Sequence, residues 1–213
     1  MATVMCYGLC LPASATNSAS EEKMVPATEM IGCLKSPEGD VELIVGRLVE
    51  TQTIDALGLN GDDLAATYEF NLYSDGTSLT GVAEHKNTVS GSDNTYSAKI
   101  TLTIYYNVDE SVYPYTYKLT RVSGNWRVTD SKATVTSAHV TSVCKDQNNP
   151  NQEDVREVSN NFDFNTGFTS YIAKETLSNY LGATLTLDFL MGTSRTYSGV
   201  FSNILFNVTT SPV

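Results

Sequence analysis

The chain has 213 residues, of which 24 are Asp or Glu and 13 are Lys or Arg, so its formal net charge at pH 7 is −11. Nucleic-acid affinity comes largely from basic side chains that neutralise phosphates, so we expect no nucleic-acid partner. No run approaches the roughly 18 apolar residues that a membrane-spanning helix needs, so we also expect no membrane span.

The first fifteen residues have features of a secretory signal peptide. Ala2–Leu11 is apolar apart from Thr3, and Ala13–Ala15 supplies the small residues of a cleavage site. The usual basic segment is missing, which fits translation from an internal Met or a trimmed chain; the alternative is an ordinary first strand. We expect residues 1–15 to be a signal-peptide remnant and residues 16–39 a linker. The protein would then be secreted, and either released or held at the cell surface by non-covalent contacts.

Cysteine usage points the same way. Cleavage after Ala15 would remove Cys6 and Cys10 and leave Cys33 and Cys144. An even number of cysteines in an exported chain predicts a disulfide, which here would close a loop of about 110 residues and contribute about 4–5 kcal/mol. The alternative is a pair of buried free thiols. Two Cys and two separated His match no zinc-site spacing, so we expect no metal and no cofactor.

From about residue 41 onward, apolar and polar residues alternate, which predicts half-buried strands. In residues 98–106, for example, Ala98 and Ile100 share one face, whereas Lys99 and Thr101 share the other. The predicted strands are 41–48, 65–73, 78–85, 98–106, 112–122, 125–129, 132–143, 158–164, 183–189 and 200–208.

Turns and irregularities separate these strands. Ser123–Asn125 predicts the turn of a hairpin. Within residues 132–143 the apolar residues change face, which predicts a β-bulge or a strand break near Ser137. Short helices are expected only around Ile54–Leu59 and Tyr171–Tyr180.

Many short strands with closely spaced turn signals predict an all-β fold with very little helix. The expected architecture is an antiparallel β-sandwich, Ig-like or related, with the alternative of two small packed β subdomains. We divide the chain into a β-meander domain, residues 40–130, and a second β-sandwich subdomain, residues 131–213. The alternative is that residues 40–213 form one domain.

No motif in the chain predicts catalysis. The Gly-x-Ser-x-Gly nucleophile motif is absent. The two imidazoles, His85 and His139, lie inside predicted strands, where a structural role is the simpler interpretation. Asn161–Gly167 resembles a calcium loop but lacks the final acidic ligand, so a strand explains it better. Dispersed acids could still form a hydrolytic pair, and they are Asp62, Asp63, Asp109, Glu110, Glu153, Asp154 and Asp163.

Tyrosines form the most suggestive pattern for binding. Tyr113, Tyr115 and Tyr117 fall on one face of a predicted strand, and Tyr105 lies in the neighbouring strand. Pro114 has no N–H to donate, so this strand is expected at an edge or a bulge of the sheet. A row of tyrosines about 6.8 Å apart could bind sugar rings or a protein partner. The alternative is a half-buried face in which the rings pack across strands.

Three segments carry a resemblance: residues 123–144 (SGNWRVTDSKATVTSAHVTSVC), 161–172 (NFDFNTGFTSYI) and 181–203 (LGATLTLDFLMGTSRTYSGVFSN). Together they resemble a loose group of small exported, β-rich proteins of Gram-positive bacteria. This resemblance covers about half of the chain. It implies export and a β-sandwich, and it implies no activity, because the group has no assigned function.

The sequence therefore predicts a secreted, non-catalytic protein. It would bind a glycan or a protein outside the cell or at the cell envelope, through Tyr105, Tyr113, Tyr115 and Tyr117. The alternative is a secreted hydrolase whose site combines dispersed acids with one His.

Overall fold

The computed structural model describes residues 26–27, 29–54, 63–74, 78–81, 97–174 and 178–208. These residues form strands and no helix, which confirms the all-β prediction. The described strands are β1 (Glu29–Lys35), β2 (Val41–Ile54), β3 (Asp63–Ser74), β4 (Leu79–Thr80), β5 (Ala98–Asp109), β6 (Thr116–Val128), β7 (Ala133–Lys145), β8 (Glu153–Glu157), β9 (Asn161–Asn165), β10 (Ile172–Ala173), β11 (Asn179–Met191) and β12 (Arg195–Val208).

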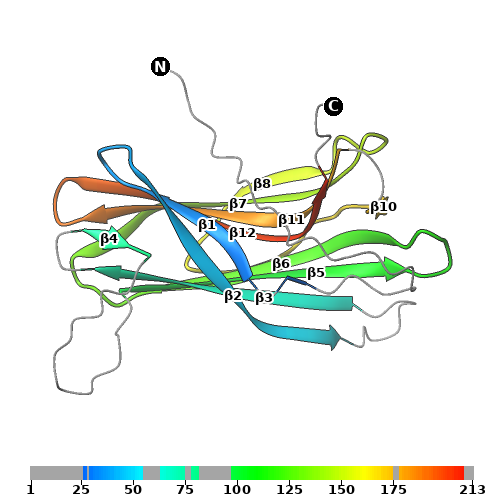
Figure 1. Ribbon diagram of the computed structural model, residues 1–213, viewed down its shortest axis with the longest axis horizontal. Coiled ribbons are helices and arrows are strands. Elements are labelled where there is room, and N and C mark those ends of the chain that lie inside the picture. The colour runs from blue at the N-terminus through cyan, green and yellow to red at the C-terminus, as the bar shows by residue number, and fades with distance from the viewer. Residues whose placement is uncertain are drawn as a thin grey trace.

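The described strands belong to one antiparallel sheet in the order β10-β6-β5-β3-β2-β1-β12-β11-β7-β8, with β4 beside β3 and β9 beside β6. The sheet curls into a half-barrel (Figure 1). One wall is formed by β3, β5 and β6, the facing wall by β7, β11 and β12, and β1 and β2 cross between them. Because β1 joins the two walls by continuous hydrogen bonding, the separate sheets of a sandwich are not confirmed.

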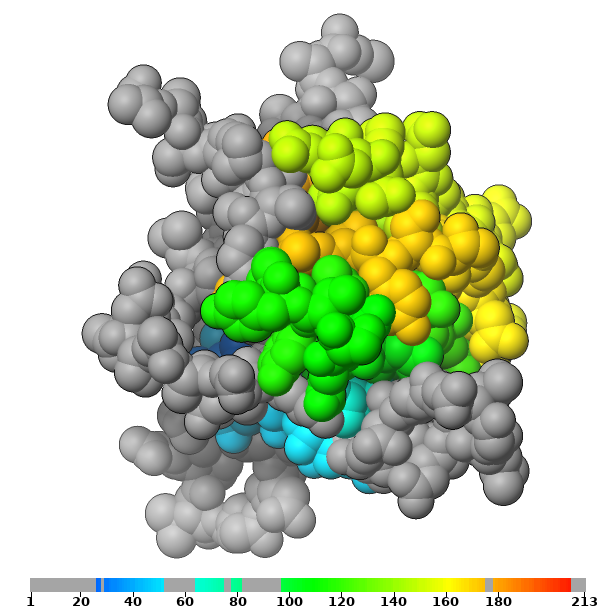
Figure 2. Space-filling model, turned by 90° about the vertical axis from the view of Figure 1, so that its right-hand side faces the viewer, coloured from blue at the N-terminus to red at the C-terminus, as the bar shows by residue number. Residues whose placement is uncertain are grey.

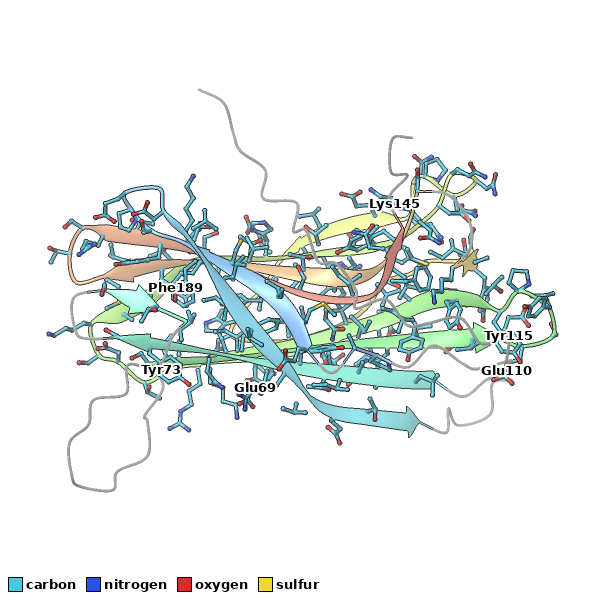
Figure 3. All side chains as sticks on the ribbon, viewed as in Figure 1. Glu69, Tyr73, Glu110, Tyr115, Lys145 and Phe189 are labelled. Atoms are coloured by element: carbon cyan, nitrogen blue, oxygen red, sulfur yellow. The ribbon has the colours of Figure 1, made fainter. Side chains whose placement is uncertain are left out.

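A hydrophobic core fills the space between the walls. Phe70 of β3 packs against Phe201 of β12 with 5.3 Å between ring centroids. Phe189 of β11 is fully buried and lies between the walls (Figure 3). Each large apolar side chain buried in this way contributes about 1.5–3 kcal/mol to folding. The core draws residues from both sides of the boundary predicted at residue 130.

One buried amide also connects the walls. The Nδ2 group of Asn203, in β12, donates hydrogen bonds to the carbonyl oxygens of Ala66 in β3 and Leu102 in β5, at 2.8 and 2.9 Å. A buried polar group costs free energy unless it is paired, so the Nδ2 group is satisfied only where the two walls meet in this register. The buried Oδ1 atom of Asn203 has no hydrogen-bond partner among the described residues.

The irregularity predicted near Ser137 is confirmed. In the pairing of β7 with β11, Ser137 lies opposite Asp188, but Val135 lies opposite Phe189, so Thr136 is an extra residue on β7. This β-bulge shifts the alternation by one residue, so Ala138 and Val140 face the core together with Ala133 and Val135 although the sequence parity changes.

The hairpin turn predicted at Ser123–Asn125 is wrong, because β6 runs through these residues without a turn. Gly124 is present for packing instead. A Cβ atom at this position would lie 2.5 Å from the Thr101 carbonyl oxygen and 2.6 Å from the ring of Phe162. Glycine in a strand marks a close approach as often as a turn, and here it makes room for an aromatic ring from β9.

Three strands lie where the sequence predicted none. Strand β1 occupies part of the predicted linker, residues 16–39, and β8 occupies part of the polar 145–157 segment. In the predicted helix Tyr171–Tyr180, the described residues belong to β10, to turns and to the start of β11. The predicted signal-peptide remnant, residues 1–15, and the predicted helix beyond Ile54 lie outside the described residues.

The structure does not join Cys33 to Cys144, which corrects the predicted disulfide. Cys33 is in β1 and Cys144 in β7, and β12 and β11 lie between them in the sheet. Three strand spacings amount to about 14 Å, whereas a disulfide needs Cα atoms within about 7 Å. In addition, Cys144 is fully buried inside the half-barrel, whereas Cys33 is only half-buried on its outer face.

Candidate functional site

The connection between β5 and β6, residues 110–115, forms an exposed aromatic loop at one end of the half-barrel (Figure 2). The side chain of Tyr113 is 85% exposed and that of Val112 is 46% exposed. The ring of Tyr115 meets that of Tyr113 edge to face, with 6.5 Å between centroids and 78° between planes. We call residues 110–115 the tyrosine loop; Figure 3 marks its first and last residues, Glu110 and Tyr115.

Hydrogen bonds at the end of β5 fix the start of the tyrosine loop. The carboxylate of Asp109 accepts bonds from the backbone N–H of Ser111, at 2.9 Å, and from its hydroxyl, at 2.6 Å. These two bonds, the hydroxyl's first, hold the pKa of Asp109 below its usual value. Such a turn orders the backbone locally, so the aromatic tip projects from an ordered base.

The predicted row of Tyr113, Tyr115 and Tyr117 does not form. Tyr117 is only 3% exposed and packs inside the core against Tyr106 and Phe206, with ring-centroid distances of 6.4 and 5.5 Å. Tyr105 lies on the outer face of β5, where its hydroxyl is 3.3 Å from that of Ser123. Only Tyr113 and Tyr115 are brought together, so Tyr117 is removed from the candidate binding residues.

Two features of β6, a bulge and its start at Thr116, explain this outcome. Tyr105 pairs with Arg121, but Tyr106 pairs with Leu119, so Thr120 is an extra residue on β6. Because β6 begins only at Thr116, the first two tyrosines of the predicted row lie in a loop rather than in a strand.

Residues 146–171 bridge the open side of the half-barrel, between β7 and β6. In this bridging segment, β8 pairs with β7 and β9 pairs with β6. Gln152 Nε2 donates to the carbonyl oxygens of Cys144 and Ser170, at 2.7 and 3.1 Å. Gln152 Oε1 accepts from the backbone N–H groups of Thr169 and Ser170, at 3.0 and 2.8 Å. One side chain therefore links β7 to the far end of the bridging segment.

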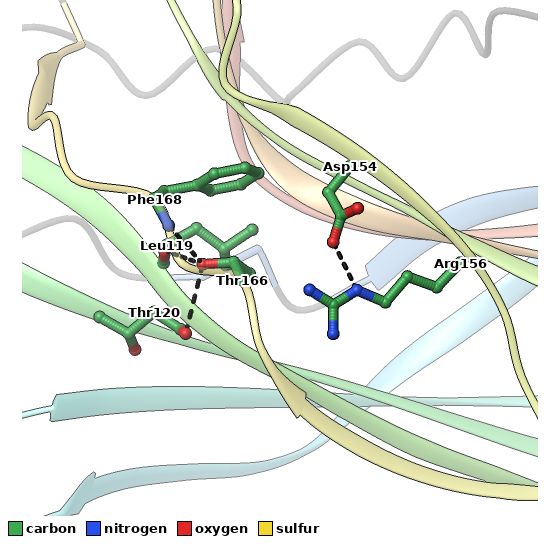
Figure 4. A network of polar contacts seen from close by, with 6 residues as sticks. All are labelled: Leu119, Thr120, Asp154, Arg156, Thr166 and Phe168. Atoms are coloured by element: carbon green, nitrogen blue, oxygen red, sulfur yellow. Dashed lines mark hydrogen bonds and ion pairs between the residues drawn. The ribbon is translucent and has the colours of Figure 1, made fainter.

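A buried hydroxyl makes a similar link (Figure 4). Thr166 Oγ1 donates to the carbonyl oxygens of Leu119 and Thr120 in β6, at 2.7 and 3.2 Å. It also accepts from the backbone N–H of Phe168, at 3.4 Å. These bonds tie the bridging segment to β6 next to the bulge.

Acids proposed for a hydrolytic pair are held in ion pairs across the bridging segment. Asp163 pairs with Arg121, Asp154 with Arg156 and Glu153 with Lys145. The hydrogen bonds from Arg121 lower the pKa of Asp163 from its ordinary value of 3.8. A general acid at neutral pH needs the opposite shift, so this carboxylate is suited to structure rather than to proton donation.

The remaining catalytic candidates do not converge either. His139 lies on the outer face of β7, in register with Glu157 of β8 and Thr186 of β11. Burial raises the pKa of the Cys144 thiol to about 11, which keeps it protonated at neutral pH and unsuited to nucleophilic attack. The predictions for His85 and Asp62 lie outside the described residues.

A pocket near the turn between β1 and β2 does contain acids. It is lined by Leu34, Ser36, Asp40, Val41, Glu42, Leu79 and Tyr197. Thr80 and the backbone N–H of Gly81 donate hydrogen bonds to Glu42, at 2.6 and 3.0 Å. The alternative predicted from the sequence, a hydrolase that combines acids with one His, gains no support here because no His lines this pocket.

Metal-binding side chains do not cluster in the part of the chain that the structure describes, where no three His, Cys, Asp or Glu residues come together. Nor does this part contain a helix long and apolar enough to cross a membrane.

The comparisons with known proteins found no matching family model, no similar curated protein and no similar solved structure. The candidate site therefore stands on its geometry. Sequence reasoning selected Tyr113 and Tyr115 but missed Val112, although the Asp-Glu-Ser run before it and the Pro after Tyr113 are signals of a loop.

Proposed function

We propose that this is a secreted, non-catalytic binding protein whose tyrosine loop docks onto a protein partner outside the cell or at the cell envelope. The observation that carries the proposal is the 85% exposure of Tyr113 at the tip of a loop with an ordered base. Tyrosine supplies a large apolar contact and a hydroxyl with little conformational entropy to lose, and it is enriched among residues that dominate binding energy.

The shape of the tip favours a protein over a glycan. The two rings meet at 78°, so they present no flat double platform on which successive sugar rings could stack. The projecting Val112 and Tyr113 side chains fit a concave apolar pocket on a partner protein better. A glycan stacked on the Tyr113 ring alone is the second candidate.

The negative charge of the tyrosine loop and of the whole chain restricts which partner surfaces fit. Asp109 lies at the base of the tyrosine loop, and Glu110 is exposed within it. The whole chain is also strongly acidic, with a net charge of −11. The matching surface should therefore be an apolar pocket with a basic rim, because complementary charges accelerate encounter and disfavour other partners.

Site-specific photo-crosslinking tests the proposal. A photoreactive phenylalanine derivative replaces Tyr113 in one variant and Val155 in the other. Val155 is 59% exposed on β8, away from the tyrosine loop, and is the matched control. We expect one dominant crosslinked protein from position 113 in the extracellular fraction of the native host, and none in common with position 155. Equal crosslinking from the two positions would contradict the proposal.

The affinity of the identified partner then gives the energetic test. Tyr113→Ser should raise the dissociation constant by a factor of about 30 or more, since exposed aromatic anchors of this kind contribute about 2 kcal/mol or more. If the protein binds glycans on an array only when Tyr113 is present, and no protein partner is crosslinked, the second candidate, a glycan ligand, would be supported instead.

Export is tested separately by intact mass of the protein recovered from the medium of its native host. A chain that begins at Thr16 supports a cleaved signal peptide. Protein retained inside the cell with residues 1–15 intact would contradict secretion.

A further inference from the structure

The outer face of β1 and β2 exposes an apolar patch that the proposed function does not use. Val41, Leu43 and Val45 of β2 are 50%, 64% and 50% exposed, and Ile31 of β1 is 38% exposed. In the pairing of the two strands, Ile31 lies opposite Val45, and Cys33 lies opposite Leu43. We call these five side chains the hairpin face. Contiguous exposed apolar patches of this kind mark interaction surfaces.

Charged residues border the hairpin face at both ends. Glu29 lies opposite Arg47 at one end, and Lys35 lies opposite Val41 at the other. Along the outer face of β1 the order is therefore acid, Ile31, Cys33, base. Glu29, Lys35 and Arg47 together carry one negative and two positive charges, and Glu69 of β3 lies opposite Arg47.

This order of charges is complementary to itself. A two-fold axis that lies parallel to the sheet and perpendicular to the strands reverses the strand direction of the second copy. Glu29 of each copy then faces Lys35 of the other, Ile31 faces Cys33, and Leu43 faces Val45. A two-fold axis parallel to the strands and midway between β1 and β2 would instead place Glu29 opposite Arg47 of the other copy and Lys35 opposite Val41. The charge-reversal variants below distinguish the two arrangements.

We propose that the hairpin face is a homodimer interface, in which two half-barrels stack face to face through β1 and β2 with their strands antiparallel across the interface. Packed sheets lie about 10 Å apart, with interdigitated apolar side chains and strands inclined by about 30°. A C2 interface uses the same patch on both copies, which the charge order of β1 allows. Because the patch is small compared with about 800 Å² per partner in stable complexes, the dimer should be weak and concentration-dependent.

Sedimentation equilibrium of the full chain over about 1–500 µM tests the dimer, since a small interface should dissociate within this range. We expect the average mass to rise from one chain towards two. A single-chain mass at every concentration would overturn the proposal, whatever else covers the hairpin face.

Apolar substitutions test the location of the interface. Leu43→Asp should raise the dimer dissociation constant by about 100-fold or more, because each copy loses the burial of one leucine. Val155→Asp, on exposed β8, is the matched control and should leave the constant within about twofold of wild type. Since Leu43 is 64% exposed, circular dichroism should show an unchanged fold for Leu43→Asp. Equal effects of the two substitutions would overturn the proposal.

Charge reversal tests the two-fold orientation. Glu29→Lys and Lys35→Glu should each raise the dissociation constant on the order of tenfold, because each places like charges opposite one another twice per dimer. The double variant Glu29→Lys/Lys35→Glu restores opposite charges and should return towards the wild-type constant. A double variant that is no better than the single variants would overturn this arrangement.

The proposed homodimer and the proposed function can be tested independently of each other. Tyr113→Ser removes the tip of the tyrosine loop and should leave the dimer dissociation constant unchanged, within about twofold. An effect of Tyr113→Ser as large as that of Leu43→Asp would place the interface at the tyrosine loop and overturn the hairpin-face proposal.

Discussion

The tyrosine loop and the bridging segment lie beside each other at β6, but they are built in opposite ways. The bridging segment is polar, and its side chains are committed to the fold: Gln152 makes four hydrogen bonds, and Thr166 makes three. The tyrosine loop has an ordered base at Asp109. Its most exposed residue, Tyr113, makes one aromatic ring contact with the described residues, and this contact is with Tyr115.

This difference suggests separate roles for the two segments, stability for the bridging segment and the proposed binding for the tyrosine loop. A curled sheet that does not close by strand pairing must satisfy the backbone groups on its open side, and polar side chains of the bridging segment do so. Exposed aromatic groups satisfy no such need and cost solubility, and this contrast is the reason that we propose a partner for the tyrosine loop. Substitutions should therefore change stability in the bridging segment and binding at the tyrosine loop.

Among the contacts of the bridging segment, the largest effect on stability is expected where this segment packs on β6. Gly124→Ala places a Cβ atom 2.5 Å from the carbonyl oxygen of Thr101 and 2.6 Å from the ring of Phe162. We expect a loss of about 2–3 kcal/mol, or a fall in the melting temperature of roughly 5–10 °C by calorimetry. The exposed neighbour Asn125→Ala, the control, should change stability by less than about 0.5 kcal/mol. Full tolerance of Gly124→Ala would mean that β6 turns here after all.

Gln152→Ala should have the next largest effect. It removes four hydrogen bonds and leaves the carbonyl oxygen of Cys144 without this partner, so we expect a loss of about 2 kcal/mol in urea unfolding. Hydrogen exchange of the Thr169 and Ser170 amides should accelerate, because Gln152 Oε1 accepts from both. Gln147→Ala, at an exposed position of the same segment, should change neither quantity. Unchanged exchange in Gln152→Ala would contradict the proposed link.

Acid should weaken the bridging segment slightly. The hydrogen bonds from Arg121 lower the pKa of Asp163 from 3.8, so this carboxylate stabilises the fold above that pH. The stabilisation is lost as the pH falls below about 4 and through the lower folded-state pKa. Because both side chains are more than 40% exposed, solvent screening limits the effect to a fraction of about 1 kcal/mol. Asp163→Asn should flatten the pH dependence of the urea midpoint between about pH 2 and 5, whereas an unchanged profile would exclude this pair as its source.

The smallest effect on stability is expected at the tyrosine loop. Tyr113→Ser should change the free energy of unfolding by less than about 0.5 kcal/mol, because the ring is 85% exposed. The same change at Tyr117, which is 3% exposed, should cost about 3 kcal/mol or more. Similar losses of unfolding free energy at both positions, measured by calorimetry, would indicate that the two tyrosines are in equivalent environments, as the sequence predicted.

The candidate site was predictable only in part. Tyr113 and Tyr115 could be selected by composition, but equal spacing also selected Tyr117, which the structure buries. Spacing assigns residues to a face only within a strand, and β6 begins at Thr116, so Tyr113 and Tyr115 lie in the loop before it whereas Tyr117 lies inside it. The sequence predicts no strand at Glu153–Glu157 because its residues are mostly polar, although its backbone pairs along the edge of β7.

By itself, the sequence determined the strands with clear alternation, such as β5, and the bulge near Ser137, because the period of side-chain exposure is a local property of extended backbone. Only the tertiary structure decided which strands pair, how the sheet curls and which cysteines can meet. These depend on contacts between distant residues, such as Asn203 with Ala66 and Leu102. The same holds for Gly124, whose role as a turn or as a space for Phe162 is set by a ring 38 residues away in the sequence.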